Sequence, residues 1–313
     1  MNKKHRLATL VALGVLSAPM LAQAQGAYDY ESFNYPGATL DSVFGINNRG
    51  DVAGIGVVSG DVMPYVYDSK KGGFTNVTPV AGFDSTAVFG IADNGTLVGS
   101  VFGAGIESGL IIDKNGAITV FDHPEDGVFF TQARDINEKG LVTGFRFPFV
   151  STSGFIYDSN NGTFTDIVPS LFTLANGINA RGDVVGSAIF DDEFGSPDPC
   201  GSSGEARPGW LRTADGSVTY FSVNGGVTAA RGITDSGTIA GWVGDGGSGL
   251  IKGFVVELDG SQCQSITIAD ADLLHVPGAS LTFVGDIKNS GEVVGHYIDE
   301  TTGTQLGYIA RPQ

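Results

Sequence analysis

Short apolar stretches alternate with polar, glycine-containing turns along the chain, and no segment after residue 24 shows the 3.6-residue apolar period of a helix. Within this pattern a ten-residue segment recurs six times without gaps. Each copy has isoleucine at its second position and glycine at its sixth and tenth positions. The copies begin at Gly45, Gly90, Asp135, Gly177, Gly232 and Asp286, which are 45, 45, 42, 55 and 54 residues apart.

Each copy predicts two short strands joined by a tight hairpin turn. The glycine at the sixth position, Gly50 in the first copy, can take the positive φ of a type I turn followed by a bulge. A third strand such as 154–157 and a fourth such as 163–167 follow, so each period contains four antiparallel strands. Four short strands in about 40 to 55 residues are typical of a β-propeller blade. A sandwich gives no reason for six copies of one motif, and a parallel β-helix uses much shorter coils.

The two ends of the chain complete this pattern. The sixth repeat stops after its third strand, 307–310, whereas residues 28–36 match the fourth strands of other repeats. We therefore expect an all-β, six-bladed propeller of four-stranded antiparallel blades, closed by pairing of the N-terminal strand with the last blade. The expected single domain covers residues 25–313, and its blades span about 38–80, 84–124, 128–169, 172–224, 227–276, and 280–311 together with strand 28–36.

The N-terminus predicts export. Lys3, Lys4 and Arg6 precede an apolar stretch of roughly ten residues, and a small-residue cleavage pattern ends at Ala24, which is typical of a cleaved signal peptide over 1–24. An uncleaved anchor is the alternative. Without the three basic residues the chain carries 14 Lys and Arg against 34 Asp and Glu. We expect a secreted or periplasmic monomer with no nucleic-acid partner and no membrane insertion.

The repeated Ile-Asn-x-x-Gly-x-Val-x-Gly pattern resembles the HAF family of probable extracellular repeat proteins, and it covers nearly the whole chain after residue 24. The His-Ala-Phe tripeptide that gives the family its name is absent here, because Gly154-Phe155 and Gly209-Trp210 are examples of what stands at the start of the third strand. The resemblance implies a propeller-like repeat fold and export. It transfers no catalytic residue.

Candidate ligand-binding residues lie where the repeats differ. The residue before each motif copy is Phe44, Phe89, Arg134, Asn176, Arg231 or Gly285, so two arginines interrupt an uncharged series on the innermost strands. Together with Asp135 and Asp286 they predict a charged ring near the axis; the alternative is that each arginine pairs with a neighbouring aspartate and joins two blades. A variable rim above the ring, with Arg146, Phe147, Phe149 and Arg207, is the other candidate.

Metal and redox chemistry have few candidates. Asp191, Asp192 and Glu193 lie in the long loop of the fourth repeat and could hold a calcium ion, but no other cofactor is indicated. Cys200 and Cys263 are the two cysteines, and an oxidising compartment permits a disulfide between them. Strand order places their loops toward opposite faces, which argues against the bond, so the pairing stays open.

Two functions remain open. The histidines after residue 24, His123, His275 and His296, fall in three separate repeats, and no Ser-His-Asp arrangement is indicated. The favoured interpretation is a noncatalytic binding or interaction propeller that presents variable loops around an axial funnel to a carbohydrate or protein ligand. The alternative is a hydrolase or lyase acting on an extracellular polymer through carboxylates in the funnel.

Overall fold

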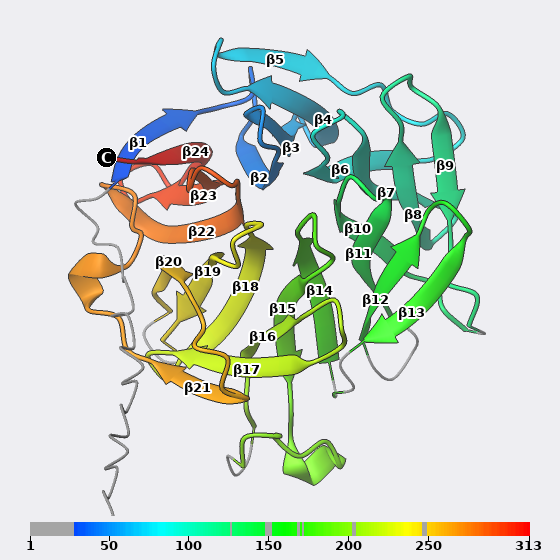
Figure 1. Cartoon of the computed structure of the whole chain (residues 1–313). Helices are drawn as coiled ribbons and strands as arrows, with labels where there is room; N and C mark the ends of the chain where they lie inside the picture. Colours follow the sequence, from blue (N-terminus) through cyan, green and yellow to red (C-terminus); the bar gives the residue numbers. More distant parts are fainter. Residues whose placement is uncertain are drawn as a thin grey trace, which may run out of the picture.

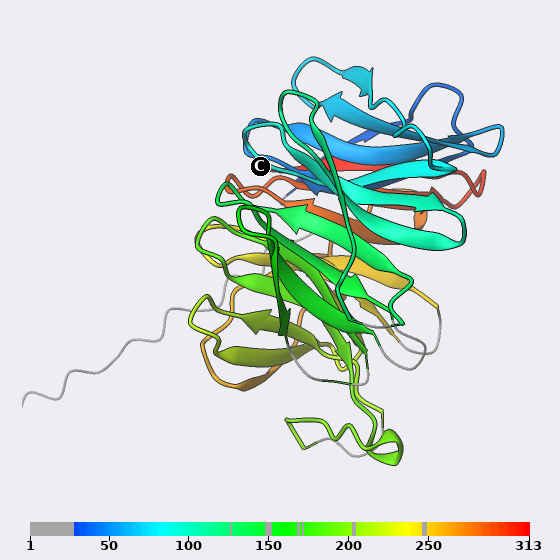
Figure 2. The ribbon, with the colours of Figure 1, turned by 90° about the vertical axis from the view of Figure 1, so that its right-hand side faces the viewer.

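The computed structural model describes residues 28–125, 127–147, 152–167, 170, 172–201, 205–245 and 249–313. The predicted signal peptide, 1–24, lies outside these residues. The strands are arranged in sheets around one axis, with the N-terminal strand beside the C-terminal one (Figure 1). In side view the sheets form a disc from which the long loop of the fourth repeat projects (Figure 2). Among the described residues, no helix is long and apolar enough to cross a membrane.

The strands follow the six sequence repeats. The first three repeats contain β2 (Leu40–Ile46), β3 (Asp51–Val58), β4 (Asp61–Asp68), β5 (Gly73–Asn76), β6 (Ser85–Ile91), β7 (Leu97–Gly103), β8 (Ile106–Ile112), β9 (Ile118–Phe121), β10 (Thr131–Ile136), β11 (Leu141–Arg146), β12 (Ser153–Asp158) and β13 (Thr163–Ile167). The last three contain β14 (Phe172–Ile178), β15 (Val184–Ile189), β16 (Gly209–Arg212), β17 (Val218–Val223), β18 (Val227–Ile233), β19 (Ile239–Gly244), β20 (Ile251–Val256), β21 (Cys263–Ile266), β22 (Ala279–Ile287), β23 (Val293–Asp299) and β24 (Gln305–Pro312). β1 (Tyr28–Phe33) precedes them all.

The fold is an all-β propeller with antiparallel four-stranded blades, but the expectation of six separate four-stranded sheets is wrong. Hydrogen bonding among the described residues gives five sheets, with eight, four, four, five and three strands. The eight-stranded sheet joins the first and last repeats through one pair, Leu40 with Gln305. In addition, β21 leaves the fifth repeat with three strands and pairs parallel with β17 of the fourth.

Closure by the N-terminal strand is confirmed. β1 pairs antiparallel with β24 in continuous register from Tyr28 opposite Pro312 to Phe33 opposite Gly307. The Phe33 ring stacks on Tyr67 at 4.3 Å between centroids, so β1 also contacts the first repeat. The first strand of the described chain therefore links the last repeat to the first and covers an edge that would otherwise be open.

The hairpin turns match the prediction. The sixth-position glycines have positive φ, from 77° at Gly140 to 102° at Gly237. The motif asparagine stabilises the turn, since Oδ1 of Asn47 accepts hydrogen bonds from the backbone N–H groups of Arg49 (3.0 Å) and Asp51 (2.9 Å).

The tenth-position glycines make room for a buried side chain on the third strand. Gly186 is the register partner of Trp210, and a Cβ added to Gly186 would lie 2.4 Å from the indole ring and 1.9 Å from the backbone oxygen of Leu174. Gly241 and Phe254 have the same relationship, with a Cβ 2.6 Å from the ring. Trp210 and Phe254 are completely buried. The motif thus places a large apolar side chain over a glycine in the middle of the sheet.

A buried acceptor repeats four residues before each motif copy. The six positions are Asp41, Thr86, Thr131, Thr173, Thr228 and Thr282. In the second repeat the Thr86 hydroxyl accepts from the backbone N–H of Val80 (2.8 Å), and Asp41 accepts from that of Tyr35 (2.7 Å) in the first. This side chain satisfies a donor in the connection that enters the innermost strand.

Candidate functional site

Each innermost strand carries a β-bulge at the residue before the motif. The register shifts between Val43 and Gly45 in the first repeat and at the equivalent place in the other five. A bulge re-aims the extra side chain. The bulged residues Phe44, Phe89, Arg134, Asn176, Arg231 and Gly285 line one cavity on the axis, of about 10 Å³, together with Asp135 and Asp286. The predicted gathering of Arg134, Asp135, Arg231 and Asp286 at the axis is therefore confirmed.

The first motif position is glycine in four repeats because neighbouring backbones almost touch there. A Cβ on Gly90 would lie 2.7 Å from the Arg134 backbone oxygen and 2.7 Å from the Asp135 Cα. A Cβ on Gly45 would lie 2.6 Å from the Phe89 oxygen. The axis is thus closed by backbone, and only Asp135 and Asp286 place side chains at this level.

These two aspartates join adjacent repeats through backbone groups. Asp135 accepts from the N–H of Ile136 and, across the gap to the fourth repeat, from that of Ile178, both at 2.8 Å. Asp286 accepts from Ile287 (2.7 Å) and from Ile46 of the first repeat (3.0 Å). Each carboxylate oxygen therefore has a donor.

The alternative of arginine–aspartate pairs between blades is wrong. Among the described residues, neither Arg134 nor Arg231 forms an ion pair with Asp135 or Asp286. Arg134 and Arg231 are bulged residues that precede the first motif position, whereas Asp135 and Asp286 occupy that position in their own repeats. The aspartate oxygens are occupied by backbone N–H groups.

Arg134 lies over two aromatic rings. Its guanidinium carbon is 4.9 Å from the centroid of Phe89 and 5.5 Å from that of Phe44, which are cation–π distances. One terminal nitrogen donates to Oε1 of Gln132 at 2.9 Å. The rings hold the flat face of the guanidinium and leave its N–H edge for polar groups.

Arg231 has fewer hydrogen-bond partners for its guanidinium N–H groups than these groups require. One terminal nitrogen donates to Oδ1 of Asn176 at the long distance of 3.4 Å. Its Nε is buried and has no hydrogen-bond partner among the described residues. The amide nitrogen of Asn176 is already bound to the Ala230 oxygen at 2.8 Å. A buried guanidinium N–H without an acceptor is costly and calls for an explanation.

Burial dominates the electrostatics of the axis. It raises the pKa of Asp135 to about 6, and it raises the pKa of Asp286 well above its usual range, with the nearby Asp135 charge adding to the effect. Burial also lowers the pKa of Arg231 to about 10, and burial together with the Arg231 charge lowers that of Arg134. The charge of Asp135 thus disfavours ionisation of Asp286, and the charge of Arg231 disfavours protonation of Arg134.

The hairpin turns of the motif copies surround one end of the propeller axis. A cavity of about 80 Å³ there has lining residues from all six repeats. At the fourth motif position, the backbone N–H of Asn289 donates to Asn48 (2.9 Å) and that of Asn48 donates to Asp93 (2.6 Å), so the sixth repeat is joined to the first and the first to the second. Ala180 offers no side-chain acceptor at this position, and the chain of contacts is interrupted there.

The predicted rim residues of the third repeat do not form an open site. Arg146 is buried and bound to Asp166 through two nitrogens, at 3.3 and 3.2 Å, and to Glu125 at 2.5 Å. Its placement as a rim ligand is corrected: it joins the connection between the second and third repeats to β13. Phe147 packs edge-to-face on Phe129, and Phe149 lies outside the described residues.

An off-axis groove of about 810 Å³ lies beside the long loop of the fourth repeat. Arg207 lines it, as predicted for a rim residue, and pairs with Glu205. The other side comes from β17 and β21, with Tyr220, Ser222 and Gln264 among the lining residues. The sequence alone does not identify these residues, because the groove requires β21 to lie against the fourth repeat.

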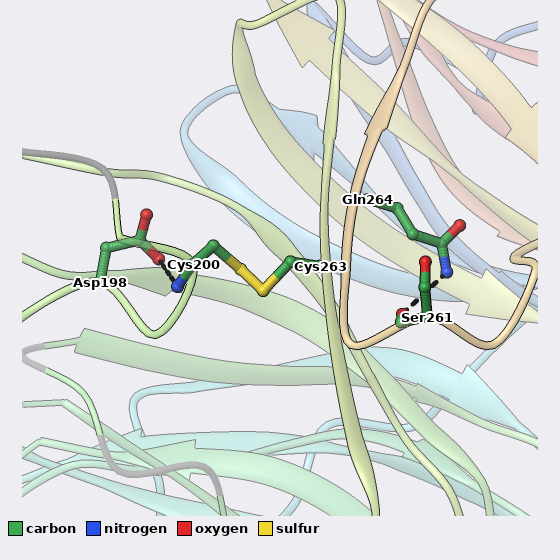
Figure 3. The surroundings of a disulfide bond; sticks show 5 residues. All are labelled: Asp198, Cys200, Ser261, Cys263 and Gln264. Atoms are coloured by element: carbon green, nitrogen blue, oxygen red, sulfur yellow. Dashed lines mark hydrogen bonds between the residues drawn. A yellow bond between two sulfur atoms is a disulfide. The ribbon is translucent and has the colours of Figure 1, made fainter.

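Cys200 and Cys263 form a disulfide at the edge of this groove (Figure 3). Their Cα atoms are 5.7 Å apart, and the backbone N–H of Cys200 donates to Asp198 at 3.0 Å. The pairing is confirmed, whereas the expectation of opposite faces is wrong. Cys263 begins a strand, β21, which pairs with β17 at Tyr220 and so comes beside the fourth-repeat loop.

The predicted calcium ligands Asp191, Asp192 and Glu193 do not form a ligand cluster in the described structure. Asp191 caps the 3-10 turn Asp192–Phe194 by accepting from the Glu193 N–H, while Asp192 and Glu193 are exposed. In the part of the chain that the structure describes, no three His, Cys, Asp or Glu side chains are grouped to hold a metal. Calcium binding at this loop stays a prediction without structural support.

The histidines are not placed as catalytic bases. His123 contacts Asp166 at 3.4 Å, beside Arg146. His296 lies between Phe283 and Phe44, and burial lowers its pKa to about 4, so it is neutral at physiological pH. Within the described part of the chain, the His296 ring contacts the backbone oxygen of Val43 and the His123 ring contacts Asp166, and neither contact involves a serine hydroxyl.

No protein-family model and no curated protein sequence matches this chain. Among solved structures, a luciferin-regenerating enzyme is similar with a TM-score of 0.53 at 11% identity, over 91% of this chain and 95% of that one. TolB from Acinetobacter baumannii has a TM-score of 0.47 at 10% identity, and the match covers 85% of this chain and 55% of TolB. Virginiamycin B lyase from Staphylococcus aureus has a TM-score of 0.46 at 12% identity, over 90% and 99%. At such identities the similarity concerns the propeller fold alone.

Proposed function

We propose that this chain is an exported, noncatalytic binding propeller of HAF-like repeats, with one blade per sequence repeat and hence six. Its ligand is a carbohydrate, bound in the off-axis groove between the fourth-repeat loop and β21 rather than in the axial funnel. The disulfide between Cys200 and Cys263 fixes the two sides of that groove.

The size of the groove carries this proposal. Pockets for small ligands have volumes of about 300 to 1,000 Å³, and the groove, at about 810 Å³, falls within that range. The two axial cavities, at about 80 and 10 Å³, are too small for a sugar unit. The loop that departs furthest from the repeat pattern thus borders a cavity of suitable size.

The lining favours a polyhydroxylated ligand. Ser222 and Ser265 offer hydroxyl groups, and Arg207 beside Glu205 offers a donor next to an acceptor. The Gln264 amide is held in place by hydrogen bonds with Asp259 and Ser261. A protein ligand usually needs exposed aromatic or aliphatic anchors. Tyr220 and Phe221, the aromatic lining residues, are buried and already packed.

The alternative, a hydrolase or lyase that uses funnel carboxylates, has less support. Asp135 and Asp286 line both axial cavities, of about 80 and 10 Å³, which are too small for a sugar unit, and each of their oxygens accepts a backbone N–H. A polymer cannot reach carboxylates in such a cavity without separation of the inner strands.

Glycan-array screening of the purified chain, followed by calorimetry on the hits, tests the proposal. Arg207→Met should weaken binding at least about tenfold, whereas Arg49→Met should leave it unchanged. Arg49 is a matched control, since it is also exposed (54% against 45% for Arg207) and also pairs with a nearby carboxylate, Asp51. Equal losses in both variants, or ligand turnover that disappears on Asp135→Asn, would contradict the proposal.

A further inference from the structure

The two axial arginines bring positive charge into a small cavity that Asp135 and Asp286 also line. Arg134 and Arg231 line the same cavity, and neither forms an ion pair within the described chain. We propose that the propeller axis is a binding site for a single-atom anion, a halide, held between the guanidinium groups of Arg134 and Arg231. This site is separate from the proposed groove and does not depend on it.

The donors at this position are suited to an anion. A guanidinium carries five N–H donors and no acceptor, so it can be satisfied only by an acceptor or an anion. The rings of Phe44 and Phe89 offer Arg134 a π face, which holds the cation but accepts no in-plane hydrogen bond. The Nε of Arg231 is buried, and none of the residues that the structure describes accepts a hydrogen bond from it.

No carboxylate of the described chain forms an ion pair with either arginine, although the charges of Glu107 and Asp135 raise the pKa of Arg134 and that of Asp286 raises the pKa of Arg231, each by less than burial lowers it. The Asp135 and Asp286 oxygens are engaged by backbone N–H groups of their own and adjacent repeats. The nearest acid on the Arg134 side, Glu107, is reached only through the amide of Gln132, which donates to it at 2.7 Å. With a pKa of about 10, Arg231 stays protonated at neutral pH. Two positive charges thus line the same axial cavity, where each acts on the other.

The dimensions limit the anion to one atom. The cavity of about 10 Å³ corresponds to roughly one water-sized sphere. Carboxylates, phosphate and sulfate need more room and would collide with the backbone that closes the axis next to Gly45 and Gly90. A halide fits this space, accepts N–H groups from several directions and requires no fixed coordination geometry.

Bromide provides a direct test. Crystals of the chain grown in sodium bromide, with diffraction measured near the bromine absorption edge, should show an anomalous peak on the axis between Arg134 and Arg231. Peaks only at the surface, or axial density without an anomalous signal, would overturn the proposal. This measurement uses the unaltered protein, so it does not depend on whether any variant folds.

Thermal unfolding gives a second test. At constant ionic strength, replacing gluconate by chloride at about 100 times the dissociation constant should raise the Tm by roughly 5 °C. Arg231→Gln should abolish the chloride effect, and Arg49→Gln, at an exposed turn position, should keep it. An equal chloride effect in the Arg231 variant, or no effect in the unaltered protein, would overturn the proposal.

Discussion

Asp41 offers the sharpest test of how this propeller is built. It occupies the position at which the other five repeats have threonine, and it is completely buried. Its carboxylate accepts from the Tyr35 backbone N–H at 2.7 Å and from the Tyr65 hydroxyl. We predict that Asp41→Thr removes an ionisation penalty and leaves the fold intact, because a threonine hydroxyl can still accept from Tyr35.

The size of the effect follows from the pKa. Burial raises the pKa of Asp41 to about 6, although the bonds from Tyr65 and Tyr35 lower it, whereas an unfolded aspartate has a pKa of about 3.9. The folded state binds the proton more tightly, so the free energy of unfolding falls as the pH rises through this window. The full penalty is about 3 kcal/mol above pH 6, and about 1 kcal/mol of it is already present at about pH 4.5.

The variant also loses a contact. Tyr65 is buried, and its hydroxyl would have no acceptor after Asp41→Thr, which costs about 1 to 3 kcal/mol at any pH in this range. We therefore expect the variant to be less stable than the original chain near pH 4.5, by up to about 2 kcal/mol, and more stable near pH 7.5, by up to about 2 kcal/mol. Between these pH values the difference should shift by about 2 kcal/mol in favour of the variant.

Urea unfolding followed by the fluorescence of Trp210 and Trp242, repeated from about pH 4.5 to about pH 7.5, measures this difference. Asp61→Thr, which removes an exposed carboxylate from the same sheet, is the control. A stability difference between the original chain and Asp41→Thr that does not change with pH would refute the reasoning. So would a difference that grows as the pH rises.

Three further outcomes follow from the fold. Gly90→Ala should destabilise the chain by about 3 kcal/mol because its Cβ would meet backbone at 2.7 Å, whereas Gly73→Ala, with nothing within 4 Å, should change the stability by less than about 1 kcal/mol in urea unfolding. Replacing Cys200 and Cys263 by serine removes a disulfide between residues 63 positions apart and should lower the free energy of unfolding by up to about 4 kcal/mol. An unchanged Tm, with and without reductant, would contradict the bond. Deleting 28–33 exposes the edge of β24 and should give concentration-dependent association in size-exclusion chromatography, and a stable monomer with unaltered cooperativity would argue against closure by β1.

The repeated features of this fold could be predicted from the sequence because they depend on local chemistry. A glycine after two or three polar residues specifies the hairpin turn, as at Gly50, and the missing fourth strand of the last repeat pointed to the pairing of β1 with β24. The axial position of Arg134 and Arg231 also followed from their place before the motif. The regular threonine series was a further local signal that could have been found.

Features that depend on long-range pairing could not be predicted. The bulges in β18 and β22 set the positions of Arg231 and Asp286. A bulge is a property of strand register, which the order of residues within one strand does not reveal. Arg146 resembles a rim residue until Glu125 and Asp166, from different segments, are seen to surround it. The Cys263–Ile266 segment follows β20 as a fourth strand would, yet it pairs parallel with another repeat.

The placement of β21 determines where this chain can be cut and rejoined. Circular permutation with new termini in the β9–β10 connection would separate no paired strands, since the second and third repeats form sheets of their own. New termini between β17 and β18 would instead place β17 at the C-terminal end of the permuted chain and β21 near its N-terminal end, so that their parallel pairing would have to form late. The fourth and fifth repeats therefore behave as one inseparable segment, and a propeller shortened or lengthened by whole repeats must keep them together.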